Sequence, residues 1–235
     1  MPRKLRFTQI GSGHGHAIGK WAALQSNPDV EAVSLREPDQ ALEILADTSI
    51  VAVAIEPRNH ASLPIAEAAI HAGKHLWFDK PAGDDWPQFA QLMDEAQARG
   101  LYVQMGYMFR YSPAFSAVST WVHSGALGHV FAVRAHMSTH VDLAERTEQS
   151  RHRGGILYDL GGHMIDQIVL LLGRPVRVSS VLHSSTPYVA STNFWSPVWI
   201  MPCKSSSALE LSVSTSSLPD APSQAVQEYP AACSR

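Results

Sequence analysis

The first half of the chain alternates short apolar runs with longer segments of helical periodicity. The apolar runs lie at 5–10, 30–35, 50–55, 75–79 and 101–105, and the helix-like segments lie at 16–26, 40–47, 61–72 and 85–99. Continuous apolar runs such as IVAVAI at 50–55 are typical of strands covered on both faces. Strands that alternate with helices predict a parallel α/β sheet with right-handed crossovers. Gly73 and Gly100 stand where two helices should end, as capping glycines do.

Near residue 112 this alternation gives way to a different pattern. From there we expect a helix at 113–124, a strand at 129–139, a polar loop at 140–153, a helix at 154–172 and strands at 176–183 and 207–214. This order indicates an α+β domain whose sheet packs against one helix. Ser and Pro accumulate from about residue 184, so we expect the end of the chain to be poorly ordered. The predicted parts are a doubly wound α/β domain at 1–108, a partial α+β domain at 109–215 and a tail at 216–235.

Composition narrows the class of protein. Hydrophobic residues make up 45% of the 235 residues, enough for a sizeable core, and no apolar run approaches the roughly 20 residues that cross a bilayer. The net charge of -3 argues against a nucleic-acid surface, which needs a basic excess. Cys203 and Cys233 form no framework of paired spacings, and the basic N-terminus lacks the apolar core of a signal peptide. We expect a cytoplasmic protein that binds neither membranes nor nucleic acids.

A glycine-rich loop joins the first predicted strand to the first predicted helix. Its sequence, IGSGHGHAIGKW at 10–21, supplies as candidate cofactor-binding residues Gly11, Ser12, Gly13, His14 and Gly15. Glycines allow a tight turn and the close approach of a phosphate, and the following helix offers free N–H groups and the positive end of its dipole. The loop therefore fits a dinucleotide pyrophosphate, although His16 stands at the third glycine position of the G-x-G-x-x-G pattern.

An acidic residue, Glu37, ends the second predicted strand, at the distance from the loop where a carboxylate binds the adenosine ribose. The neighbouring Arg36 would instead suit a 2′-phosphate, so both NAD and NADP are candidate cofactors. Two other interpretations of the loop stay open: a tight turn without a ligand, and a metal site on His14 and His16. The metal site is the weaker one, because the loop has no carboxylate or thiolate nearby in the sequence.

Lys80 follows the fourth predicted strand, within HAGKHLWFDKPAG at 71–83. It lies at the carboxyl edge of the sheet, where open α/β sheets bind ligands, and Pro81 fixes the chain directly after it. A lysine at this edge could hydrogen-bond a substrate hydroxyl and stabilise the negative charge that develops as its proton leaves. For the residue alone, a solvated lysine at the start of a loop is an equally good interpretation.

Three ionisable residues, Asp159, His163 and Asp166, interrupt the apolar helix predicted at 154–172. Residues four apart share one face of a helix, so the side chains of Asp159 and His163 should point the same way. A histidine titrates near neutral pH and is suited to take a hydroxyl proton. On the residues alone, Asp159 could equally be an N-cap, and Asp166 could support the structure or orient His163.

Four segments, taken together and in order, resemble the Gfo/Idh/MocA oxidoreductases, the relatives of glucose-fructose oxidoreductase and inositol dehydrogenase. They are the glycine loop, GKHLWFDKPAG at 73–83, GYMFRYSPAF at 106–115 and GGILYDLGGHMIDQIVLLLG at 154–173. The resemblance runs from about residue 5 to about residue 182. It implies a Rossmann domain followed by a domain with a large, mostly antiparallel sheet. The activity it implies is hydride transfer between NAD or NADP and a secondary alcohol or ketone of a sugar, inositol or related polyol.

The resemblance also assigns catalytic residues. Asp79, Lys80 and Pro81 stand where the family has Glu-Lys-Pro, which implies that Lys80 is the catalytic lysine and that Asp79 lies at the cofactor. The family's Asp and His pair falls on Asp159 and His163. It implies that the histidine acts as acid or base and that the aspartate helps to hold the substrate.

Further residues of the site follow from the same resemblance. Pro57 and His60 resemble part of the loop on the nicotinamide side of the cofactor. Tyr107 and Arg110 match the segment that enters the second domain, and they are candidate substrate-binding residues. Members of the family also tend to form homo-oligomers.

The sequence departs from the family pattern in two places. The stretch between Glu37 and Ile50 has room for one helix only, so we expect an edge strand of the Rossmann sheet to be missing, which trims the adenine side of the cofactor pocket. The resemblance fades after about residue 183, so we expect a second domain that is incomplete at its C-terminal end, with part of the oligomer interface lost. Two rival functions follow: an NAD-dependent, glycosidase-like reaction, and a dinucleotide-binding regulatory protein without turnover.

Overall fold

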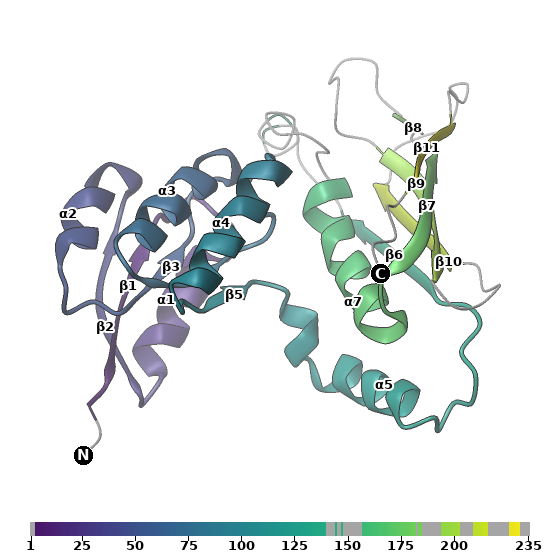
Figure 1. Ribbon diagram of the computed structural model, residues 1–235, viewed down its shortest axis with the longest axis horizontal. Helices are drawn as coiled ribbons and strands as arrows, with labels where there is room; N and C mark the ends of the chain where they lie inside the picture. Colours follow the sequence, from purple (N-terminus) through teal and green to yellow (C-terminus); the bar gives the residue numbers. More distant parts are fainter. Residues whose placement is uncertain are drawn as a thin grey trace. The chain divides into compact units, whose positions relative to one another are not determined.

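The structure is a computed structural model of the 235-residue chain. It describes residues 3–139, 144, 147, 157–181, 183–184, 194–202, 209–215 and 226–230. The chain forms two compact units, unit 1 at Met1–Gly106 and unit 2 at Tyr107–Arg235, which are drawn in Figure 1. None of the helices in the described ranges is long and apolar enough to cross a membrane.

Unit 1 is built on a five-stranded sheet in the order β2-β1-β3-β4-β5, and all four pairings are parallel. Its strands are β1 (Leu5–Ile10), β2 (Val30–Arg36), β3 (Ala52–Ile55), β4 (His75–Phe78) and β5 (Val103–Met105). Its helices are α1 (Ala17–Ser26), the short η1 (Pro38–Gln40), α2 (Ala41–Ala46), α3 (Asn59–His71) and α4 (Trp86–Ala98). The predicted Rossmann-type α/β fold is therefore confirmed.

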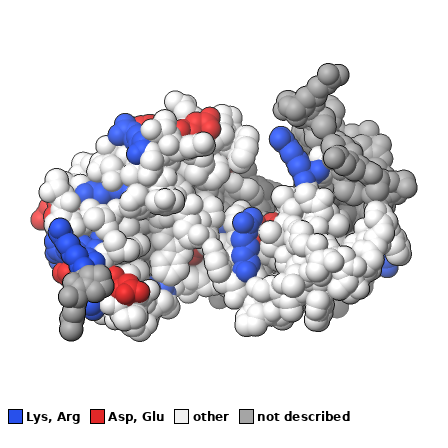
Figure 2. Space-filling view, turned by 60° about the horizontal axis from the view of Figure 1, so that its bottom comes forward, with Lys and Arg blue, Asp and Glu red and all other residues white. Residues whose placement is uncertain are grey.

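Both faces of this sheet are covered, as the continuous apolar strands predict. Val53 and Ile55 of β3 belong to a core cluster with residues of α2, α3 and α4, whereas Ala54 packs with Leu24 of α1 in a second cluster. Successive side chains of a strand point to opposite faces, so these clusters lie on the two sides of the sheet. Figure 2 shows Lys and Arg mixed with Asp and Glu on the drawn face of unit 1.

Strand β2 forms one edge of the sheet. In the six-stranded Rossmann order 3-2-1-4-5-6 a further strand pairs with the strand at this position. Here residues 37–51 are described throughout and contain η1 and α2 but no strand, which confirms the predicted loss of an edge strand. The shortened connection is held by buried Lys74, whose Nζ donates to the carbonyl oxygens of Asp47 and Ile50 at 2.7 and 2.9 Å.

Helix ends in unit 1 follow the predicted capping pattern. Gly73 and Gly100 adopt φ of +73° and +68° after α3 and α4, a conformation in which side chains are strained and glycine is not. Their amides donate to the carbonyl oxygens of Ile70 and Gln97. At the start of α4, the Asp85 side chain accepts a hydrogen bond from the backbone N–H of Gln88 at 3.0 Å. These contacts satisfy groups that a helix end otherwise leaves unpaired.

Unit 2 contains helices and a second sheet. The helical elements are η2 (Met108–Tyr111), α5 (Pro113–His123), the π-helical turn η3 (Leu157–Gly161) and α7 (Gly162–Leu172). The strands are β6 (Arg134–Thr139), β7 (Pro175–Val181), β8 (His183–Ser184), β9 (Phe194–Pro202), β10 (Leu209–Thr215) and β11 (Val226–Pro230). The strand order is β11-β7-β9-β10-β6, with β8 beside β9. The pairings are antiparallel except that of β10 with β6.

The core of unit 2 lies between α7 and neighbouring elements, where Met164 and Ile168 pack against apolar residues of η2, β6 and β7. Two strands, β9 and β11, have no counterpart among the strands expected from the sequence. β9 runs antiparallel to both β7 and β10, and β11 pairs with β7. Backbone pairing of this kind depends on distant partners, so a search for local periodicity does not find it. Most of the predicted loop at 140–153 lies outside the described residues.

Candidate functional site

The glycine loop crosses the carboxyl end of β3 so closely that its first glycine has no room for a side chain. Gly11 has a φ of +95°, and a Cβ placed on it would lie 2.3 Å from the backbone nitrogen of Pro57. A Cβ placed on Gly13 would lie 3.2 Å from Arg58 Cγ, whereas a Cβ placed on Gly15 would have no neighbouring atom within 4 Å. Gly11 is therefore required by the fold, while Gly15 leaves the open space that a close-approaching ligand needs.

Two contacts hold this loop against the sheet. The buried side chain of Gln9 donates from Nε2 to the carbonyl oxygens of Gly11 and Ala17, at 3.1 and 2.9 Å. At the other side, Ser12 Oγ donates to Glu37 Oε1 at 2.5 Å. The carboxylate predicted to bind a ribose thus lies beside the loop, at the end of β2, where a dinucleotide would need it.

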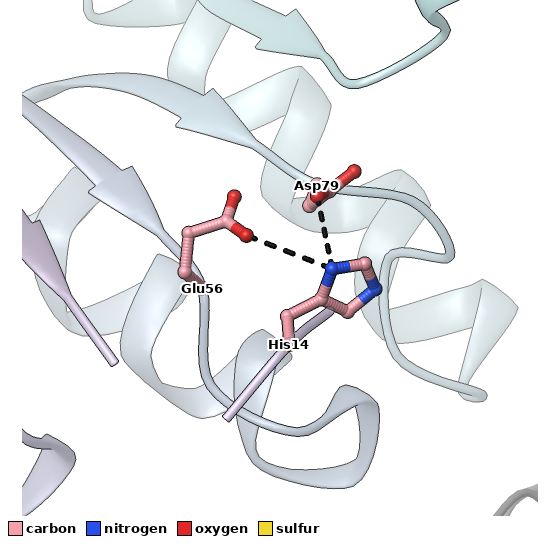
Figure 3. A group of neighbouring side chains, drawn as sticks. All are labelled: His14, Glu56 and Asp79. Carbon is pink, nitrogen blue, oxygen red and sulfur yellow. Dashed lines mark ion pairs between the residues drawn. The ribbon is translucent and has the colours of Figure 1, made fainter. Parts of the chain in front are cut away.

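A group of four charged or titratable side chains lies beneath the loop. His14 Nδ1 is 3.2 Å from Asp79 Oδ2 and 3.6 Å from Glu56 Oε2, and Figure 3 shows the imidazole between the two carboxylates. Lys20 of α1 forms an ion pair with Glu56, and its Nζ lies 3.6 Å from Asp79 Oδ2 and 4.6 Å from the centre of the Trp77 ring. The imidazole of His14 therefore points under the loop, toward the ends of β3 and β4.

Burial and mutual attraction act in opposite directions on the two carboxyl groups of this cluster. Burial raises the pKa of Glu56 to about 7, against the opposing attraction of Lys20. Burial also acts to raise the pKa of Asp79, but Lys20, His14 and the backbone N–H of Lys80 together lower it below its ordinary value. Near neutral pH, Asp79 is consequently ionised, whereas Glu56 is the carboxyl group that is closer to exchanging a proton.

The cluster supplies the carboxylates that the glycine loop itself lacks. The metal interpretation of the loop was weakened by the lack of a carboxylate near His14 along the chain, yet Glu56 and Asp79 approach His14 in space, with the three donor atoms within 4.8 Å of one another. Lys20 already supplies one positive charge beside both carboxylates, in the place that a metal ion would take.

Lys80 follows β4 and is only 3% exposed, so its interpretation as a solvated loop lysine is wrong. Its backbone N–H donates to Asp79 Oδ1 at 2.7 Å, and its peptide bond to Pro81 is cis. A Cβ on Gly106 would lie 2.2 Å from that same Asp79 oxygen. Asp79 is thus fixed between the backbone of Lys80 and a position where only glycine fits.

The remaining candidate residues of unit 1 lie just after β3. Pro57 is buried and forms the surface against which Gly11 packs. His60 is exposed, in the first turn of α3. The roles of both at a cofactor stay predictions.

In unit 2, the predicted catalytic histidine is buried in an aromatic setting. His163, on α7, is 2% exposed, and its ring centre lies 5.0 Å from that of Phe109 and 6.2 Å from that of Tyr107, whose ring it meets edge-on. Burial raises the pKa of Tyr107, and the nearby charge of Asp166 adds to that effect. Asp159 lies within the π-helical turn η3, and the N-cap of α7 is Gly161, so Asp159 is not the N-cap of this helix. Such turns are frequent at functional sites.

Asp166 has a defined partner within unit 2. Its carboxylate accepts hydrogen bonds from Arg110 Nε at 2.9 Å and from a terminal guanidinium nitrogen at 2.5 Å. Asp166 is buried, whereas the Arg110 side chain is 44% exposed. The paired carboxylate raises the pKa of Arg110 above its already high value. Asp166 therefore fixes the orientation of a guanidinium that still reaches solvent, and this bidentate contact accounts for its place on the helix.

Sequence comparisons relate the chain to known oxidoreductases. A sequence model of the GFO/IDH/MocA C-terminal domain matches residues 115–212. The uncharacterized oxidoreductase YdgJ of Escherichia coli is 26% identical over 224 residues, which are 86% of this chain and 63% of YdgJ. The dTDP-3,4-didehydro-2,6-dideoxy-alpha-D-glucose 3-reductase of Streptomyces violaceoruber is 34% identical over 60% of this chain and 41% of the reductase. Levoglucosan dehydrogenase of Pseudarthrobacter phenanthrenivorans is 25% identical over 69% of this chain and 45% of the dehydrogenase.

Solved structures show the same architecture. The YPO2259 oxidoreductase from Yersinia pestis superposes with a TM-score of 0.79 at 23% identity, covering 91% of this chain and 64% of that one. GenD2 from gentamicin A biosynthesis, solved in complex with NAD, gives a TM-score of 0.80 at 22% identity over 91% of this chain and 66% of GenD2. At such identities the likeness establishes the fold.

Proposed function

We propose that this chain is a member of the Gfo/Idh/MocA oxidoreductases, whose C-terminal domain it resembles over residues 115–212, and that it transfers hydride between NAD or NADP and a secondary alcohol or ketone of a sugar, inositol or related polyol. The observation that carries the proposal is the glycine loop, closed against β3 at Gly11 and open at Gly15. The names of relatives that act on a deoxysugar nucleotide and on levoglucosan support a polyhydroxylated substrate.

The residues around the loop suit a dinucleotide. Gly15 leaves space above the start of α1, whose N–H groups favour an anion such as a pyrophosphate. Glu37 would exchange its contact with Ser12 for the ribose hydroxyls, and Pro57 and His60 would flank the nicotinamide side. When bound, the cofactor supplies or accepts the hydride.

We assign the proton chemistry to three side chains. Lys80 hydrogen-bonds the reacting oxygen and stabilises negative charge on it, and Asp159 helps to hold the substrate. His163 takes the hydroxyl proton during oxidation and returns it during reduction. Arg110, oriented by Asp166, and Tyr107 serve substrate binding.

A cofactor titration followed by a substrate panel tests this proposal. Nicotinamide fluorescence of NADH and NADPH, titrated with purified protein, reports binding and the preference for either cofactor. Single-turnover hydride transfer is then measured with sugars, inositols and glycosides. We expect transfer with at least one free polyol. Glycoside cleavage that depends on NAD would favour the glycosidase-like rival, binding without transfer would favour a regulatory protein, and no binding at all would refute the proposal.

Substitutions test the assigned roles. His163→Ala and Lys80→Ala should each slow single-turnover transfer by roughly 10²–10⁴-fold, the usual contribution of a positioned acid or base. His123→Ala is the matched control, because His123 is an exposed histidine on α5 of the same unit, and it should leave the rate unchanged. Near-normal rates in both test variants would contradict the assignment.

A further inference from the structure

The group beneath the glycine loop connects two parts of the proposed cofactor site. We propose that His14, Lys20, Glu56 and Asp79 act as one positioning unit that ties the glycine loop to the backbone of Lys80 through a shared proton, so that cofactor affinity depends on whether the unit holds that proton. This inference rests on the proposed function, and it assigns a role to Lys20 and Glu56, which the proposed reaction does not use.

The geometry links three neighbouring strands. His14 belongs to the loop after β1, Glu56 follows β3 directly, and Asp79 follows β4. The backbone N–H of His14 donates to the carbonyl oxygen of Glu56 at 3.1 Å, while its ring reaches both carboxylates. Asp79 in turn accepts from the backbone N–H of Lys80. A shift at either end of this chain of contacts is therefore transmitted to the other end.

The charges of the unit balance only when it carries one extra proton. With both carboxylates ionised, Lys20 charged and His14 neutral, the unit has a net charge of minus one. Its side chains are nearly all buried, Glu56 completely, and an uncompensated charge is costly in such a place. One proton held within the unit, on Glu56 or on His14, removes that charge, in agreement with the pKa of Glu56 near 7.

Losing this proton should weaken the binding of a pyrophosphate. The lost proton leaves a negative charge directly beneath the loop proposed to hold two phosphates, and like charges repel strongly where water is excluded. The groups that face Glu56 are Lys20 from α1, His14 from the loop and Asp79 from the end of β4, and Asp79 in turn feels the charge of His16.

The pH dependence of NADH binding tests the proposal. NADH is the suitable probe, because the 2′-phosphate of NADPH itself titrates near pH 6. For the wild-type protein, we expect the NADH Kd to rise about tenfold between about pH 6 and about pH 8.5, as the shared proton is lost. Glu56→Gln removes the titrating group and should flatten this rise. Glu43→Gln is the matched control, since Glu43 is an exposed glutamate on α2, and it should keep the wild-type profile.

Three other outcomes of these measurements would overturn the proposal. If Glu56 had a purely structural role, Glu56→Gln would change the NADH Kd by the same factor at every pH value. That result would overturn the proposal. So would a rise that persists in Glu56→Gln but disappears in His16→Asn, since the proton would then belong to His16. Stoichiometric Zn²⁺ binding that is lost in Glu56→Gln would also overturn it, because a metal would take the place of Lys20.

A second readout separates this inference from the proposed function. The slope of the thermal unfolding midpoint against pH is measured for the wild type and Glu56→Gln without any cofactor. A difference in slope supports the proton-holding unit even when NADH does not bind, a result that would refute only the proposed function. Equal slopes would overturn the inference irrespective of cofactor binding.

Discussion

Replacing Gly11 by alanine should damage the fold itself, before any cofactor is considered. The residue has a φ of +95°, outside the range that alanine adopts without strain. The new Cβ would lie 2.3 Å from Pro57 N and 2.6 Å from the carbonyl carbon of Glu56. Both neighbours are backbone atoms at the end of β3. There the backbone N–H of Glu56 donates to the carbonyl oxygen of Ile10 at 2.8 Å. They cannot yield as the end of a flexible side chain would.

The expected loss in the free energy of unfolding of Gly11→Ala is the sum of two contributions. Holding a non-glycine residue in a sparsely populated conformation costs about 1–3 kcal/mol, and forcing an extra methyl group into a packed site costs a further ~1–3 kcal/mol. We therefore expect Gly11→Ala to lower the free energy of unfolding by roughly 4 kcal/mol, a large share of a typical stability. For a chain of this length, that loss corresponds to a fall in Tm of roughly 8–16 °C.

Thermal and urea unfolding of Gly11→Ala and Gly15→Ala, without cofactor, provide the assay. Gly15→Ala is the control, because nothing lies within 4 Å of its new methyl group, and its stability should change by less than about 1 kcal/mol. With NADH present, Gly15→Ala should instead lose affinity, since its methyl group enters the space proposed for the pyrophosphate. Equal Tm values for the two variants would refute the steric reasoning.

Three further predictions concern the charged contacts. Burial raises the pKa of Glu56 from 4.5 to about 7, so between these pH values the folded protein binds more protons than the unfolded chain. The free energy of unfolding therefore falls as the pH rises through this interval. Urea unfolding at stepped pH should show this loss in the wild type and not in Glu56→Gln. Gly106→Ala should lower both Tm and the hydride-transfer rate, because its Cβ displaces the side chain of Asp79. Arg110→Ala should cost about 1–3 kcal/mol by removing the charged partner of the buried Asp166 carboxylate. A double-mutant cycle with Asp166→Ala should give a coupling of about 0.5–3 kcal/mol, and additive losses would contradict this pairing.

Most of unit 1 could be predicted from the sequence, because its signals are local. An apolar run such as 50–55 can only be covered on both sides, and the glycines at 73 and 100 mark helix ends by their own conformational freedom. The absent edge strand was also predictable, since residues 38–50 leave room for a single short helix. Strands β9 and β11 were not expected, because they are defined by distant partners in the sheet.

The candidate site was predicted less completely for the same physical reason. The loop, Lys80 and His163 each stand in a recognisable local pattern, whereas the cluster around Glu56 exists only once β1, β3 and β4 lie side by side. Signals for it were present all the same: Lys20 shares the inner face of α1 with Ala17 and Leu24, and Glu56 directly ends a fully apolar strand. A charged residue at a buried position needs a buried partner.

The edge position of β2 determines how a bound dinucleotide would divide its affinity between its two halves. No described strand lies beyond β2, so an adenosine near Glu37 has a supporting surface on one flank only. In the proposed binding mode the phosphates and the nicotinamide ring, by contrast, would contact the loop and the ends of two central strands. We therefore expect the nicotinamide half to contribute most of the affinity, and nicotinamide mononucleotide should replace the whole dinucleotide at a modest loss of affinity. With such a distribution, changes to the adenosine moiety of a cofactor should cost unit 1 little affinity, and simplified synthetic cofactors should bind it.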